Sequence, residues 1–164
     1  MTSRFMAVMA AAVLALSMAL SPTSAEARKN IVRTAANAGQ FNTLIAAAKA
    51  AGLANVLASR RNLTVFAPTD AAFAKLGKKT IRNLLKPRNR KKLRKILLYH
   101  VLGKRVTAGR IKFGRSRAHT LAGPGVHLRK TRKGVRVNRS KVVAANVRAS
   151  NGVIHVIDRV LIPN

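Results

Sequence analysis

The chain has few side chains that could carry out acid–base or nucleophilic chemistry. It contains three acidic residues, four histidines and no cysteine. Hydrolysis by paired carboxylates needs two of them at one site, but Asp70 follows Pro68-Thr69, where a carboxylate suits the start of a helix. The histidines are scattered, without a His-x-x-x-His pair: His100, His119, His127 and His155. Because cysteine is absent too, the sequence offers a poor ligand set for zinc or iron.

A Ser–His–Asp set can be drawn from Ser150, His155 and Asp158. The serine is not in a Gly-x-Ser-x-Gly turn, which positions the nucleophile in many hydrolases. His155 also lies in an apolar run, where a histidine is typically a hydrogen-bonded core residue. We therefore predict that the protein is not an enzyme, with no catalytic residue, no metal site and no cofactor.

The apolar run that contains His155 predicts a strand from Val153 to Ile162, covered on both faces. Asn151-Gly152 before it predicts a tight turn, because both residues tolerate positive φ. Pro163 is expected to end the strand. The two faces are Val153, His155, Ile157, Arg159 and Leu161, and Ile154, Val156, Asp158, Val160 and Ile162. We expect the rest of the chain to fold around this strand.

Helical spacing dominates the first half of the chain and alternation the second. Helices are predicted from residue 30 to 57 with a break at Gly52, from 69 or 70 to Gly77, and along 93–98. Strands are predicted at 63–66, 126–128 and 135–137, the last two joined by a turn at Lys133-Gly134. Helices followed by strands indicate an α+β fold rather than a parallel βαβ fold.

The N-terminus has the pattern of an export signal. Arg4 precedes an apolar run from Met6 to Leu20, and Ala25-Glu26-Ala27 is a small-x-small cleavage box. We predict a signal peptide at residues 1–27 and one domain at 28–164, with no membrane span after cleavage. An uncleaved anchor is the alternative, although the run is shorter than the roughly 20 residues that a span needs. The mature chain keeps the net charge of +30.

Three stretches together resemble the signature motifs of the fasciclin domain family, in that family's order. They are 63–73 (LTVFAPTDAAF), 98–101 (LYHV) and 149–158 (ASNGVIHVID), and the resemblance extends over residues 30–163. It implies an α+β fold, a β-wedge of about seven strands with a flanking helical layer. It also implies an adhesion or matrix-binding role outside the cell or at its surface, without an established catalytic activity. The short single-domain layout resembles secreted bacterial members.

Within these motifs we expect fold-forming roles rather than ligand contacts. The residues concerned are Thr69, Asp70, Tyr99, His100, Asn151, Gly152, His155 and Asp158. Two departures from the family pattern also matter. Asn146 and Val147 stand where matrix members of vertebrates carry an Asp-Ile pair credited with receptor adhesion, and Arg139 replaces the glycine of a Val-Asn-Gly strand end. Integrin-type recognition is therefore not expected.

The basic surface is the feature that departs most from the family. The chain has 33 Lys and Arg residues against three Asp and Glu residues. Candidate polyanion-binding residues form two groups: Lys86, Arg88, Arg90, Lys91, Lys92, Arg94 and Lys95, and then Arg129, Lys130, Arg132, Lys133, Arg136 and Arg139. A further basic stretch, residues 104–117, lies between them. Alternation with Val135 and Val137 predicts that Arg136 points to solvent.

Such an excess of one charge predicts anionic partners. For an exported, periplasmic or cell-surface protein these are acidic polysaccharide, lipopolysaccharide or anionic lipid headgroups, with nucleic acid bound only non-specifically because aromatic residues for stacking are scarce. The oligomeric state is left open. Adaptation to an acidic habitat, or solubility, is the alternative explanation of the charge, and it needs no ligand. A different function, small-molecule or lipid carriage, would need an apolar cavity of more than about 300 Å³ between helices and wedge.

Overall fold

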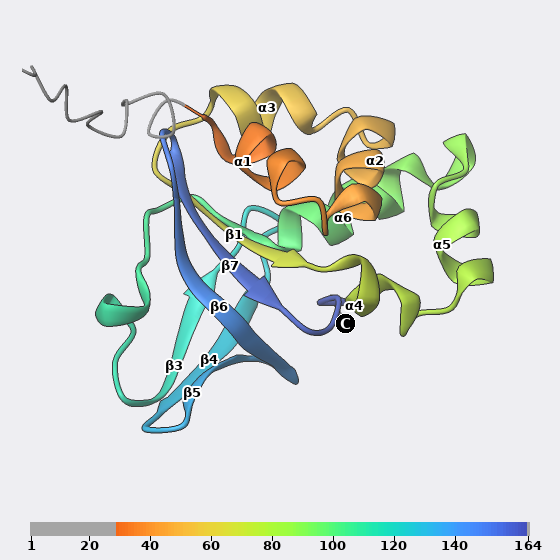
Figure 1. The fold of residues 1–164 in the computed structure, drawn as a ribbon. Coiled ribbons are helices and arrows are strands. Elements are labelled where there is room, and N and C mark those ends of the chain that lie inside the picture. The colour runs from red at the N-terminus through yellow and green to blue at the C-terminus, as the bar shows by residue number, and fades with distance from the viewer. Residues whose placement is uncertain (1–28, 164) are drawn as a thin grey trace, which may run out of the picture.

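The computed structural model describes residues 29–163, in which helices cover one part of a seven-stranded sheet (Figure 1). The helices are α1 (Ile31–Asn37), α2 (Asn42–Ala50), α3 (Ala54–Ser59), α4 (Asp70–Ala74), α5 (Lys78–Leu84) and α6 (Arg90–Tyr99). The strands are β1 (Leu63–Pro68), β2 (Val101–Leu102), β3 (Gly114–His119), β4 (Gly125–Thr131), β5 (Gly134–Val137), β6 (Ser140–Ala149) and β7 (Gly152–Ile157). The α+β prediction with about seven strands is confirmed.

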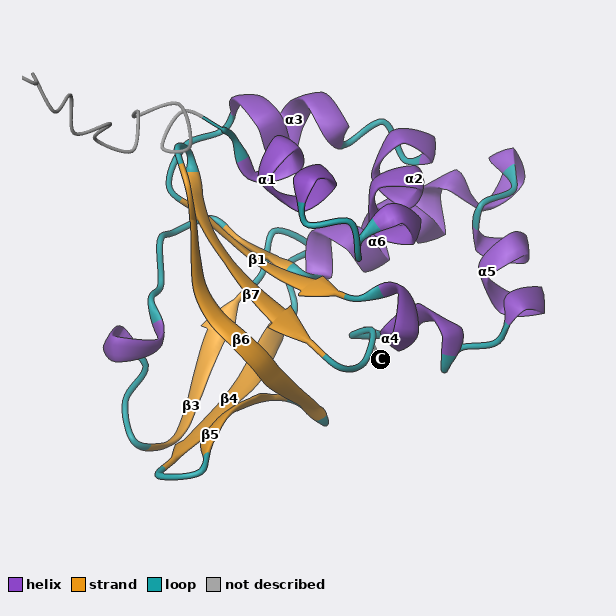
Figure 2. Cartoon of the chain, in the orientation of Figure 1, coloured by secondary structure: helices purple, strands orange, loops and turns teal. Residues whose placement is uncertain are grey.

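The strand order is β2-β1-β7-β6-β5-β4-β3, so β7 lies inside the sheet. It pairs in parallel with β1, from Leu63 opposite Gly152 to Pro68 opposite Ile157. On its other side it runs antiparallel to β6. Figure 2 shows α1 to α6 on the side of β1 and β7, while β3, β4 and β5 extend away from them. The predicted signal peptide lies outside the described residues.

Every residue of β7 is buried, which agrees with a strand covered on two sides. Ile154 and Val156 pack into the core under the helices, whereas Ile157 packs into a second core between the sheet halves. The prediction that the strand continues to Ile162 is wrong, because it ends at Ile157. There the chain bends away: the Leu161 amide donates to Nε2 of His100 at 2.9 Å instead of to a neighbouring strand.

The tight turn predicted at Asn151-Gly152 is present, since Ala149 and Gly152 pair across it, but neither Asn151 nor Gly152 has positive φ. Asn151 acts through its side chain instead: Oδ1 accepts from the Ile31 amide, and Nδ2 donates to the carbonyls of Leu57 and Arg60. Gly152 is required by close approach, because a Cβ there would overlap the carbonyl oxygen of Leu63. This turn therefore joins β7 to α1, α3 and β1.

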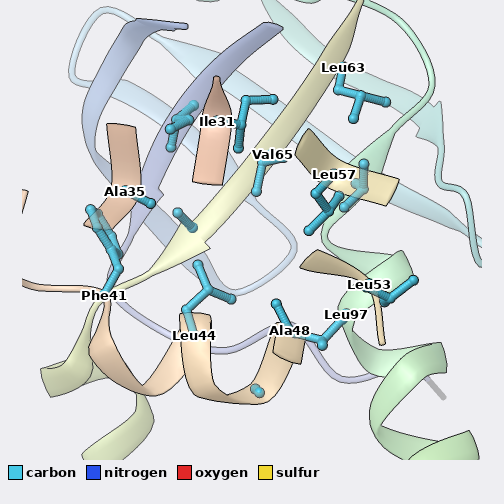
Figure 3. Close-up of a cluster of buried hydrophobic side chains, with 14 of the residues drawn as sticks. Ile31, Ala35, Phe41, Leu44, Ala48, Leu53, Leu57, Leu63, Val65 and Leu97 are labelled. Carbon is cyan, nitrogen blue, oxygen red and sulfur yellow. The ribbon is translucent and has the colours of Figure 1, made fainter. Parts of the chain in front are cut away.

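The core under the helices is assembled from α1, α2, α3, α6 and the central strands (Figure 3). Leu44 and Ala48 of α2 meet Leu97 of α6 and Val65 of β1 in this cluster. Their spacing places apolar side chains on one face of each helix. Helix α5 was not predicted, because its apolar pattern is weak. None of its residues is buried in the structure.

Candidate functional site

Thr69 and Asp70 both serve helix ends, but not the same helix. Thr69 Oγ1 accepts from the Ala72 amide at 3.1 Å and caps α4. The Asp70 carboxylate reaches α2, where it accepts from the amides of Thr43 at 2.7 Å and Asn42 at 3.2 Å. Partial burial raises the pKa of Asp70, but these hydrogen bonds outweigh it and hold the pKa below its ordinary value. Asp70 thus ties α4 to α2.

Tyr99, at the end of α6, is buried in the second core. Its hydroxyl donates to the carbonyl of Gly125 at 3.3 Å and accepts from Asn138 Nδ2 at 3.2 Å. The Asn138 side chain also accepts from the His127 amide. One phenol thereby joins the helical layer to β4 and to the turn between β5 and β6.

His100 and His155 are both buried and both accept a backbone N–H, which fixes each ring as neutral. In His100, Nε2 accepts from Leu161, so Nδ1 carries the proton and donates to the Ile96 carbonyl at 2.8 Å. In His155, Nδ1 accepts from the Asn146 amide, so Nε2 donates to Val106 at 2.7 Å. Burial lowers the pKa of His100 to about 4 and lowers that of His155, each against an opposing hydrogen bond to a carbonyl.

The Ser–His–Asp set is not assembled. Both ring nitrogens of His155 are occupied by backbone groups, and the Asp158 carboxylate accepts from the Lys141 amide. Ser150 lies exposed in the turn before β7. Within residues 29–163 no group of three or more His, Asp or Glu side chains is placed to hold a metal ion.

The first group of candidate cations lies on the helical side of the molecule. Lys86, Arg88, Arg90, Lys91, Lys92, Arg94 and Lys95 are all exposed, around the start of α6 and along its outer face. Lys86 and Arg88 line a hollow of about 470 Å³ with Lys79 and Arg82 of α5. Figure 1 places α5 and α6 away from β3–β5, so the two groups of candidate cations do not form one face.

The second group lies on the solvent face of β3, β4, β5 and β6, where the strand register aligns four cations. Arg115 pairs with Arg129, Arg129 with Arg136, and Arg136 with Lys141. We call these four residues the cationic row. All four are exposed, and three of them line a surface hollow of about 420 Å³ with Thr131 and Lys133. Arg136 is exposed between buried Val135 and Val137, as predicted.

A second hollow, of about 730 Å³, continues this face at the other end of the strands. Its rim carries Arg117, Arg139, Arg159 and His127, of which Arg117 and His127 pair across β3 and β4. Arg132 and Lys133 are exposed in the turn between β4 and β5. Lys130 differs from the other candidates, because its ammonium donates to the Ala108 carbonyl at 2.9 Å and lies 4.7 Å above the Phe113 ring.

The row has no internal counter-charge. Some cations do have internal partners: Arg105 donates to Ala149 and Gly152, and Lys75 to Asp158, all through backbone carbonyls. Within residues 29–163 the structure gives no hydrogen bond or ion pair to the side chains of the four row residues. The carboxylates described, Asp70 and Asp158, accept from backbone amides instead. The row therefore has charge available for an external anion.

Sequence reasoning missed part of this row. Arg115 was recognised only as part of the basic stretch 104–117, and Lys141, Arg117 and Arg159 were likewise not among the candidate binding residues. The alternation Arg115-Ser116-Arg117 was the one available signal that the first two arginines share a strand face. Which residues lie opposite them depends on register, which the sequence did not provide.

The apolar interior leaves little space for a carried molecule. Between α1, α2, α6 and the central strands there is a cavity of about 30 Å³, lined among others by Leu44 and Leu97. That volume is close to the share of one water molecule in liquid water. It is about a tenth of the smallest ligand pockets, so the geometry does not favour the carrier function. No helix among residues 29–163 is long and apolar enough to cross a bilayer.

Sequence comparison finds several relatives. A model of the Fasciclin domain matches residues 39–163. Protein sll1483 of Synechocystis is 43% identical over 147 residues, covering 90% of this chain and 81% of that protein. Immunogenic protein MPB70 of Mycobacterium bovis is 35% identical over 130 residues, 79% of this chain and 61% of that protein. Transforming growth factor-beta-induced protein ig-h3 of Sus scrofa is 37% identical over 124 residues, 76% of this chain and 18% of that protein.

Structural comparison gives the same fold. A FAS1 domain pair from the insect cell adhesion molecule Fasciclin I superposes with a TM-score of 0.54, over 77% of this chain and 45% of that chain. The two sequences are 21% identical. At that identity the likeness establishes the shared fold and nothing about ligands.

Proposed function

The chain belongs to the fasciclin domain family, and we propose that it is an exported adhesion module that holds anionic polymers of a cell envelope or matrix on its basic surface. Members of this family often act in cell adhesion or interact with extracellular matrix, and fasciclin domains are in general adhesion modules without enzymatic activity. Family membership alone leaves the ligand open. The chemistry of this chain's own surface supports a polyanion.

The observation that carries the proposal is the cationic row with no internal partner. Like charges directly opposite one another across strands destabilise a sheet, and three such pairs follow one another here. An anionic chain would remove that repulsion and form charge-assisted hydrogen bonds with the guanidinium groups. A solubility device would not need the cations to stand opposite one another.

Three partner classes fit this surface: acidic polysaccharide, lipopolysaccharide and anionic lipid headgroups. Nucleic acid would be held only through its phosphates. Among the aromatic side chains, Phe41, Phe66, Phe73 and Tyr99 are buried, which leaves Phe113 as the exposed ring among the residues described. Base stacking strengthens single-strand binding, and few exposed aromatic rings are present in the described part of the chain to provide it. We expect phosphate binding to show a strong salt dependence and no sequence preference.

Binding of the mature domain to heparin, to lipopolysaccharide and to vesicles containing anionic lipid would test the proposal. We expect retention at low salt that falls steeply as salt rises, because bound polyanion releases counterions. A variant in which Arg115, Arg129, Arg136 and Lys141 are all glutamine should elute at lower salt than one with four substituted cations elsewhere. Failure of the domain to bind any polyanion at low salt would overturn the proposal.

Export is the second part of the proposal. Homologues in this family are secreted or surface proteins, and the predicted signal peptide at 1–27 would direct this chain to the periplasm, the cell surface or the medium. Mass spectrometry of the protein recovered from each fraction would locate it and read the new N-terminus. We expect a chain that begins at Arg28. Recovery of the full-length chain from the cytoplasm would contradict export.

A further inference from the structure

We propose that the cationic row binds a linear polyuronate, a polysaccharide that carries one carboxylate on every sugar, laid across strands β3 to β6. This inference rests on the proposed polyanion binding and specifies its ligand. It follows from the direction and the spacing of the row rather than from the total charge.

The row runs at right angles to the strands. Arg115, Arg129, Arg136 and Lys141 are register partners on four successive strands, one from each. Neighbouring strands lie about 4.8 Å apart, so the anchor points of the four side chains recur at that distance. A ligand that satisfies all four must be extended and must present one anion for each strand that it crosses.

The strand spacing discriminates among linear polyanions. Successive pyranose rings of an extended sugar chain follow one another at about the strand spacing (~4.8 Å), with their carboxylates on alternate edges. A polyuronate therefore offers one carboxylate, on one edge or the other, for each row residue. In an extended acidic peptide, side chains on one face recur every two residues, roughly 6.6 Å. Phosphates joined through a single oxygen, as in polyphosphate, lie closer together than the strands. The sugar polymer therefore matches the row best.

The side chains of the row suit carboxylates. Three of the four are arginines, whose planar fork of N–H donors matches a carboxylate in a bidentate geometry. Arg129 and Arg136 stand side by side in the middle, and they line the hollow of about 420 Å³ together with Lys141. The long side chains can reach a carboxylate on either edge of the sugar chain. Lys130 does not contribute, since its ammonium turns to Ala108.

Calorimetry with galacturonate oligosaccharides of one to six sugars would test this inference on the mature domain. We expect affinity to rise at each step up to four sugars and to change little beyond, because the row has four cations. Oligomers with methyl-esterified carboxylates should not bind. Hyaluronan, which has a carboxylate on every second sugar, should bind more weakly than polygalacturonate of equal length.

Arg136→Gln removes one of the two cations, with Arg129, that have a row partner on both sides. Arg33→Gln, at an exposed position of α1, is its matched control. Loss of one charge-assisted contact should weaken tetragalacturonate binding by about 10-fold. The control, which lowers the net charge equally, should change it by less than about 2-fold, as expected of a distant charge. Both substitutions lie on exposed surface, so both variants should fold.

The outcomes separate this inference from the proposed function. If heparin or anionic vesicles bind while galacturonate oligomers of every length do not, the inference is overturned and the proposed function stands. Equal weakening by Arg136→Gln and Arg33→Gln would also overturn it, because binding would then follow net charge. If no polyanion binds at all, both are wrong.

Discussion

Acidification from pH 7.5 to pH 5 should destabilise the domain through His100. The neutral ring accepts the Leu161 amide at Nε2, so a second proton there would break a buried hydrogen bond and place a charge in the core. Its pKa is lowered from 6.5 to about 4 in the folded protein. The unfolded chain therefore binds this proton more tightly. The free energy of unfolding should fall as pH decreases from about 6.5 to about 4, with no further change from this group below that.

The size of the effect follows from the shift. One pKa unit corresponds to about 1.4 kcal/mol, so the full loss is about 3 kcal/mol, of which about 2 kcal/mol is reached at pH 5. For a domain of this length that corresponds to a decrease in Tm of roughly 8 °C. His155, whose pKa is also lowered, acts in the same direction. Asp70 acts only in more acidic solution, because its pKa lies below 3.8.

This chain makes the measurement unusually clean, because it has only three acidic residues, one of them in the predicted signal peptide. Histidine is the side-chain type whose ordinary pKa lies in the range of this measurement, and the chain has four histidines. Urea unfolding at intervals over this range would give the slope, and exposed His119 and His127 offer control substitutions to glutamine. His100→Gln should lower stability at pH 7.5 but flatten the slope.

Nuclear magnetic resonance on the unsubstituted protein would test the protonation state of His100 directly, without requiring that His100→Gln folds. The ring nitrogens should report the Nδ1–H tautomer for His100 and the Nε2–H tautomer for His155. The His100 ring should stay neutral at pH 5 in the folded protein. A His100 that titrates near 6.5 in the native state, or a stability that is flat from pH 7.5 to 4.5, would refute this reasoning.

Substitutions at Gly152, Asp70 and Arg136, the first two with comparison variants, test other features of the structure. Gly152→Ala should destabilise by about 3 kcal/mol or prevent folding, because its Cβ would meet the Leu63 carbonyl. Gly109→Ala, whose Cβ would make only an ordinary contact with Thr107 Oγ1 at 3.9 Å, should be nearly neutral; equal urea midpoints would contradict this. Asp70→Ala should cost about 1 kcal/mol by removing the cap of α2, and Asp70→Asn less, in the same assay. Arg136→Gln should raise Tm by about 2–4 °C at low salt and by nearly nothing at 1 M salt; an unchanged Tm at low salt would mean that the row is not under repulsion.

Periodicity and propensity were enough to predict the fold class and the buried central strand. Both faces of this strand are buried in the structure: Ile154 packs into one core and Ile157 into the other. The same pattern could not locate the strand's end. An apolar residue such as Leu161 is buried either in a strand or in a loop that packs on the core, and only the partner of its amide, His100 Nε2, distinguishes the two.

The turn before β7 shows a second limit of local reasoning. Asn-Gly favours positive φ in isolation, yet here the roles of both residues are set by contacts with distant segments of the chain. Asn151 is surrounded by carbonyls and an amide from segments more than ninety positions away in sequence, and Gly152 makes room for β1. Asp70 is similar, since it caps a helix that begins 28 residues earlier. Such roles depend on which segments of the chain come together in the folded structure, and the local sequence does not show this.

The cationic row depends on register in the same way, which explains why a list of basic residues could not find it. What makes the row possible is that the fold does not use the side chains of its four cations for stability. Asp70, Tyr99, His100, Asn151 and His155 all bond to backbone groups inside the molecule. Repulsion among exposed cations therefore costs stability in small increments, without breaking any of these contacts. Such a surface can be made uniformly basic while the interior stays intact, and a bound polyanion would then stabilise the domain by relieving that repulsion.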